Sequence, residues 1–277
     1  MKRFIRLTKS IHRNSTKLPL CALPWIGVLV GCNSMPGAGL VDREPIPAEQ
    51  RSMPQAKAVE RLGTLGIACK PEALYSAVAK DDIEVVRLLL KAGVKATAIN
   101  KHGRTALHQA AELGKIRTVE ALLEDGVPVD IKSVQGTTPL MEACGSAQVD
   151  VARLLISKGA KVNVRNPSKA TALMYAAKGP PEDMIRRLGE GNLGSDQRGG
   201  VPSGLQGGSA ADAKVFEAYL SKQREAYYEV VRLLVEHGAS LNLRMDVGYT
   251  PLDVAQGANQ TKIVQFLISK GAKPGKK

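Results

Sequence analysis

The sequence is poor in aromatic residues and in cysteine, and these shortages exclude several classes of protein. Only ten of its 277 residues are Phe, Trp or Tyr, so we expect an aliphatic core of Leu, Val, Ile and Ala. Four cysteines in a chain of this length are too few for a small secreted domain held together by disulfides. No apolar run reaches the roughly 20 residues that a membrane-spanning helix needs, which excludes a polytopic membrane protein.

Acidic residues are missing from the first 31 positions, where six of the 39 basic residues lie. The formal net charge of the whole chain is +13, but beyond this segment the basic excess falls to seven. A mild excess of this kind is not typical of a nucleic-acid-binding protein. We therefore expect no nucleic-acid partner.

A largely apolar segment of fourteen residues without a charge, Leu18–Gly31, follows the basic N-terminus. This length is too short to cross a membrane but is typical of the apolar region of a signal peptide. The run ends in Leu29-Val30-Gly31-Cys32, which resembles the lipobox of bacterial lipoproteins. The small Gly31 admits the peptidase, and the Cys32 thiolate accepts diacylglycerol.

The lipobox resemblance predicts a signal peptide at residues 1–31, a lipidated Cys32 and a location in the bacterial cell envelope. Asn33 stands where an Asp usually means retention in the inner membrane, so the outer membrane, on its periplasmic side, is favoured in a Gram-negative cell. An uncleaved anchor or a wrongly assigned start codon is the alternative. Residues 32–67 are rich in proline and are expected to form a flexible tether, in which the amphipathic stretch 56–62 is apolar enough to fold onto the domain that follows.

The remaining chain repeats with a period of 33 residues. Leucines recur at 74, 107 and 140 and at 89, 122 and 155, and glycines recur at 93, 126 and 159. After a jump of 79 residues the period resumes, which defines five blocks: 68–100, 101–133, 134–166, 167–245 and 246–277. The fourth block contains 46 extra residues, at about 180–226.

Each block is expected to contain two helices. Thr138-Pro139 and Thr250-Pro251 are typical helix openings, because Thr caps the first turn and Pro occupies a position whose amide has no partner. The second helix has aliphatic residues at helical spacing and ends at a glycine such as Gly126, which closes a helix in the left-handed conformation.

These blocks resemble the ankyrin repeat family, and the resemblance covers about residues 68–277. It implies an all-α solenoid of about five helix-turn-helix-loop repeats that binds a protein partner with its hairpin tips and the exposed side of each first helix. Two departures are Glu72-Ala73 in place of the Thr-Pro opening of the first block, and Lys169 in place of the glycine at the fourth hairpin tip.

No enzymatic, metal or cofactor site is expected. The histidines lack metal-ligand spacing, and no nucleophile elbow or phosphate-binding loop is present. By resemblance, His108 has a structural role, with its ring bonded to the Thr105 hydroxyl. Cys69 and Cys144 fall at different points of the repeat, so a disulfide between them is not expected.

The resemblance assigns partner-binding positions to the tips and first helices. In the second block these are Lys101, His102, Arg104, Glu112 and Leu113. In the third and fifth blocks they are Val134, Gln135, Thr137, Ser146, Asp246, Val247 and Tyr249.

The insertion divides into a glycine-rich part, 189–208, expected to be mobile, and a strongly helical part, 210–229. The second part is predicted to continue into the second helix of its block. Phe216 and Tyr219 either pack this helix on the solenoid or form a recognition patch, and the sequence leaves both open.

The first functional hypothesis is a non-catalytic, monomeric binding scaffold that is tethered by lipid. It captures a protein partner in the envelope, as an immunity protein or a chaperone does. The alternative is a structural organiser whose basic tail, Lys270, Lys273, Lys276 and Lys277, contacts an anionic cell-wall or membrane polymer.

Overall fold

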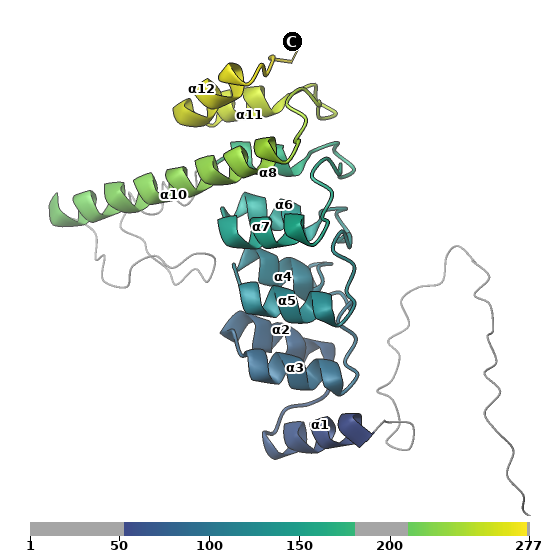
Figure 1. The fold of residues 1–277 in the computed structure, drawn as a ribbon. Helices are drawn as coiled ribbons and strands as arrows, with labels where there is room; N and C mark the ends of the chain where they lie inside the picture. The colour runs from purple at the N-terminus through teal and green to yellow at the C-terminus, as the bar shows by residue number, and fades with distance from the viewer. Residues whose placement is uncertain (1–52, 181–209, 276–277) are drawn as a thin grey trace, which may run out of the picture. The chain divides into compact units, whose positions relative to one another are not determined.

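The computed structural model describes residues 53–180 and 210–275, and every regular element in these ranges is an α-helix (Figure 1). Residues 1–52, which include Cys32, lie outside the described part, as does the glycine-rich segment of the insertion. The helices form two layers, and each repeat contributes one helix to each layer. This arrangement confirms the predicted all-α solenoid.

The first layer consists of α2 (Pro71–Lys80), α4 (Ala106–Glu112), α6 (Pro139–Gly145), α8 (Ala172–Ala177) and α11 (Pro251–Gly257). The second layer consists of α3 (Ile83–Lys91), α5 (Ile116–Glu124), α7 (Val149–Ser157), α10 (Ala210–Glu236) and α12 (Thr261–Ser269). Each helix contacts its partner in the other layer and the next helix in its own layer. Because every repeat buries its apolar faces only against its neighbours, the stack is stable as a unit.

Threonine occupies the N-cap of α4, α6, α8 and α11, as predicted, and at α6 and α11 a proline follows it, whereas the Thr171 hydroxyl at α8 makes no capping bond. The Thr138 hydroxyl accepts a 3.3 Å hydrogen bond from the Met141 amide, and Pro139 follows at the first helical position. Thr250 forms a reciprocal capping box with Asp253. These bonds satisfy amide groups that otherwise have no partner within the helix.

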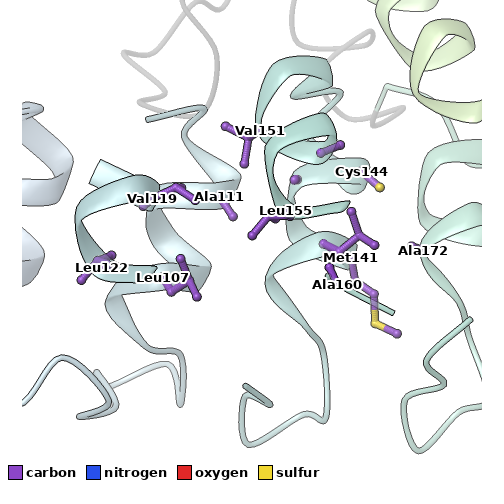
Figure 2. Close-up of a cluster of buried hydrophobic side chains, with 14 of the residues drawn as sticks. Leu107, Ala111, Val119, Leu122, Met141, Cys144, Val151, Leu155, Ala160 and Ala172 are labelled. Atoms are coloured by element: carbon purple, nitrogen blue, oxygen red, sulfur yellow. The ribbon is translucent and has the colours of Figure 1, made fainter. Parts of the chain in front are cut away.

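The core runs between repeats without interruption. Leu107 of α4, Leu122 of α5 and Leu155 of α7 are completely buried, and Figure 2 shows them within one cluster of side chains contributed by neighbouring repeats. Ala111 lies in the same cluster and is too small to hold adjacent helices apart. Truncation of any of the three leucines removes about 2–5 kcal/mol of stability, because a cavity remains.

The N-terminal edge of the solenoid differs from the predicted flexible tether at residues 32–67. Residues Met53–Thr64 form a helix, α1, that packs on α3. Ala58 is 4% exposed and Leu62 is fully buried, so the amphipathic stretch noted in the sequence covers the first repeat. The tether prediction was therefore wrong for this part of the range, because the apolar face of α3 needs a cover that proline content alone does not reveal.

The fourth hairpin tip keeps the shape of the others although it lacks their glycine. Lys169 adopts φ +58°, and its amide donates to the Asn166 carbonyl at 2.8 Å. Gly136 makes the equivalent 2.9 Å bond to the Ser133 carbonyl in the preceding repeat, at φ +72°. The tip thus holds a lysine in a backbone conformation that favours glycine.

The helix after the insertion is continuous, as predicted. α10 runs for 27 residues from Ala210 to Glu236 and contacts α7, α8 and α12. Its C-terminal half supplies the second-layer helix of the fourth repeat, with Val231 and Leu234 fully buried. Its N-terminal half extends beyond the short helices of the neighbouring repeats (Figure 1).

Candidate interaction groove

A groove of about 1090 Å³ follows the first-layer helices and the hairpin tips of the first four repeats. Seven of the fourteen residues that the sequence analysis offered as partner contacts line it: Lys101, His102, Arg104, Glu112, Leu113, Gln135 and Thr137. These residues come together because the 33-residue period places equivalent positions side by side in successive repeats.

The other predicted residues lie elsewhere. Asp246 and Tyr249 are exposed on the fifth hairpin tip, beyond the groove, and Asp246 forms a 2.7 Å ion pair with Lys169. Ser146 follows the end of α6 and does not line the groove. Tyr219 is half-buried on α10, whereas Phe216 lies in the part of α10 whose side chains are not described. The choice between packing and recognition for these two aromatics therefore stays open.

Short-range hydrogen bonds fix the hairpin tips that form one wall of the groove. The Asn100 amide donates to the Arg104 carbonyl at 2.8 Å, and the Asn100 side chain accepts from the amides of His102 and Arg104. Adjacent tips are also joined, because the Val134 amide donates to the Gly103 carbonyl at 2.9 Å. The wall is consequently preformed, and little ordering is needed when a ligand binds.

An ion cluster crosses the groove between the second and third repeats. The Arg104 guanidinium lies 2.7 Å from a carboxylate oxygen of Glu112 and 3.8 Å from one of Glu142. The exposed fractions of the two carboxylate side chains are only 14% and 17%. Burial raises the pKa of Glu142, and the nearby Thr137 hydroxyl and Arg104 charge oppose this rise.

Thr137 contributes differently from the predicted direct contact. Only 5% of this residue is exposed, and its hydroxyl donates a 2.8 Å hydrogen bond to Glu142. Its short side chain lies beneath the surface at a position where Arg104 and Tyr249 reach outward in other repeats. Direct contact between Thr137 and a partner therefore stays a prediction, and what the structure shows is that the residue orients Glu142.

Nine residues that line the groove were not among the predicted partner-binding positions, and Tyr75, Glu142 and Tyr175 are three of them. The Tyr75 hydroxyl donates to backbone carbonyls of the adjoining hairpin, those of Ala98 and Arg104, while the Tyr175 hydroxyl accepts a 3.2 Å bond from Asn166. Glu142 and Tyr175 occupy the same repeat position as Gln109, one period apart. This shared repeat position could have identified them from the sequence. A polar side chain in a first-layer helix made mostly of small residues faces away from the core.

His108 has the structural role that the resemblance implied. Its Nδ1 lies 2.8 Å from the Thr105 hydroxyl, and its Nε2 lies 2.9 Å from the Thr137 carbonyl. Because a carbonyl oxygen only accepts, Nε2 carries the proton and Nδ1 accepts. Burial lowers the pKa of the imidazole, which keeps it neutral. The ring thus links the second and third repeats beneath the groove.

The cysteines and the lysines of the basic tail do not form a further site in the described ranges. Cys69 and Cys144 are both free thiols, and burial raises the pKa of Cys144. No group of three or more metal-ligating side chains occurs in the described ranges. Lys270 and Lys273 of the basic tail are exposed, whereas Lys276 and Lys277 lie outside the described part. Among the described helices, none is both long and apolar enough to cross a membrane.

The comparison with protein families agrees with the repeat geometry. The sequence matches ankyrin repeats (3 copies), at residues 55–133, 126–197 and 219–277. No curated protein matches it significantly. The family match begins within α1, as does the packed part of the chain. On the evidence of the period, the paired helices and this match over most of its length, the chain belongs to the ankyrin repeat family.

Proposed function

We propose that the chain is a non-catalytic scaffold that captures a protein partner in its groove. The observation that carries this proposal is the continuity of the groove over four repeats, with seven predicted binding residues along it. Ankyrin repeats generally act as protein-interaction modules, which supports the same conclusion. A preformed, partly polar concave surface is the form that such recognition usually takes.

Site-specific photo-crosslinking tests this proposal. A photoreactive amino acid replaces Gln135 in the groove, and a matched variant carries it at Arg117, which is exposed on the second-layer helix α5. We expect Gln135 to yield a discrete crosslinked species that the Arg117 variant does not form. Equal crosslinking at both positions contradicts the assignment of the groove.

We further propose that the scaffold is anchored in the bacterial envelope through lipid on Cys32, with the outer membrane favoured by Asn33. The support is the Leu29-Val30-Gly31-Cys32 motif after a short apolar run. A Cys32→Ala variant should lose labelling by a fatty-acid probe and its membrane association, whereas Cys21→Ala, within the same run, should retain both. Unchanged labelling of Cys32→Ala contradicts the anchor. Within this setting, an immunity or chaperone role is the form of capture we favour.

A further inference from the structure

The groove differs in charge from the chain that contains it. The whole protein carries a formal charge of +13, yet three carboxylates, Glu72, Glu112 and Glu142, face the groove against two permanent cations. One of these cations, Arg104, is already shared between Glu112 and Glu142. The other, Lys101, is exposed at the rim.

The Arg104 guanidinium neutralises the two carboxylates unequally. It makes a close 2.7 Å contact with Glu112 but stays 3.8 Å from Glu142, beyond hydrogen-bonding distance. Thr137 donates to the other oxygen of Glu142, which leaves the oxygen nearer to Arg104 without a close donor among the described residues. A partly buried carboxylate in this position gains from an added cationic donor.

Two tyrosines line the groove with this cluster. Tyr75 is held by the Ala98 and Arg104 carbonyls, and Tyr175 by Asn166. Fixed aromatic rings near a carboxylate suit a guanidinium, which forms bidentate bonds to carboxylates and stacks on aromatic faces. An ammonium group offers neither the planar stacking nor the paired donors.

We infer that the groove binds an extended segment of its partner that presents a basic side chain, arginine in preference to lysine, to Glu142 beside Tyr175. This inference rests on the proposed function and names the chemistry of the bound segment. Charge complementarity selects this occupant, since an acidic segment would face three carboxylates across the groove. The cation completes the coordination of Glu142 that Arg104 leaves unfinished.

The test uses a display library of random dodecapeptides selected against the full-length chain. A Gln109→Trp variant, which places an indole in the groove and obstructs it, identifies the peptides that bind there. We expect these peptides to share an arginine, and its replacement by citrulline, which keeps the shape and removes the charge, to weaken binding about tenfold or more.

Protein variants provide the reciprocal measurement. Glu142→Gln removes the charge while its amide oxygen can still accept from Thr137, and we expect a similar loss of affinity at an unchanged melting temperature. Glu236→Gln, an exposed acid at the end of α10, should bind as the parent does. Because the citrulline peptide is measured on the parent protein, the test does not depend on the folding of any variant.

The two proposals fail in distinguishable ways. The inference is overturned if the groove-binding peptides lack a basic residue, or if citrulline replaces their arginine without loss of affinity. Either result leaves the proposed binding scaffold intact. Selected sequences that match this chain itself assign the groove to a second copy and also overturn it. If no selected peptide is sensitive to Gln109→Trp, the proposed function fails and the inference fails with it.

Discussion

The hydroxyl of Tyr227 in α10 donates a 2.7 Å hydrogen bond to the carbonyl oxygen of Gly145 at the end of α6. The two residues are 82 positions apart, and Tyr227 is only 3% exposed. A Cβ atom on Gly145 would lie 3.3 Å from the Tyr175 ring, so the same residue also adjoins the groove wall. The helix that follows the insertion thereby supports the helix that carries Glu142.

Loss of this bond should destabilise the solenoid. In Tyr227→Phe the ring remains but a buried carbonyl loses its donor, and we expect the free energy of unfolding to fall by about 1–3 kcal/mol. Tyr249→Phe, at a residue 57% exposed, is the control and should change little. Urea denaturation of both variants measures the difference, and equal stabilities contradict the supporting role of α10.

Alkaline pH should destabilise the protein through its buried phenols. Burial raises the pKa of both Tyr75 and Tyr227 to about 12. Both are neutral in either state below about pH 10, so no stability is lost there. Above about pH 10 the unfolded chain releases these protons before the folded chain does. Each tyrosine then lowers the free energy of unfolding by up to about 1.4 kcal/mol per pH unit until about pH 12. The pH slope of urea denaturation should become shallower in Tyr227→Phe, and an unchanged slope rules out this contribution.

Mild acid should act through His108. Its pKa is lowered by burial, so the folded chain resists a proton that the unfolded chain accepts below about pH 6.5. Its contribution is fully present above that pH and is lost as the pH falls toward the folded value. His108→Gln should remove this loss between about pH 7.5 and 5.5, whereas His237→Gln, at an exposed ring, should retain it. A parent protein with flat stability over this range contradicts the prediction.

The period of 33 predicted the repeats, their caps and the continuity of α10, because all three depend on local sequence. Leu122 and Leu155 are core residues in any stack that keeps this register. The groove was predicted only in part. Tyr175 shares its register with Gln109 and Glu142, which was an available clue, whereas Tyr75 stands one period before the buried His108, so the period alone does not place it in the groove.

Thr137 shows a second limit of sequence reasoning. Thr137 occupies the same repeat position as Arg104. The short threonine side chain is buried there, whereas the longer arginine side chain reaches the groove. Helix α1, by contrast, packs on α3 through the amphipathic stretch 56–62 that the sequence analysis singled out, although the prolines of the range 32–67 suggested a tether.

Backbone strain at Lys169 offers a stabilising substitution. Its φ of +58° suits glycine, so Lys169→Gly should raise the free energy of unfolding by about 1 kcal/mol. Lys169→Ala is the matched control, because it removes the same exposed ion pair with Asp246 but keeps the strained conformation. Thermal denaturation should rank glycine above alanine, and the reverse order contradicts the assignment of strain.

The groove as the partner-binding surface is tested most directly by the affinity of Gln109→Trp for the partner crosslinked through Gln135. Gln109 lines the groove, so an indole at this position obstructs it, and Arg117→Trp places the same group on the exposed side of α5. We predict that the Kd rises about tenfold or more for Gln109→Trp and stays unchanged for Arg117→Trp, with equal melting temperatures. An unchanged Kd for Gln109→Trp contradicts the account.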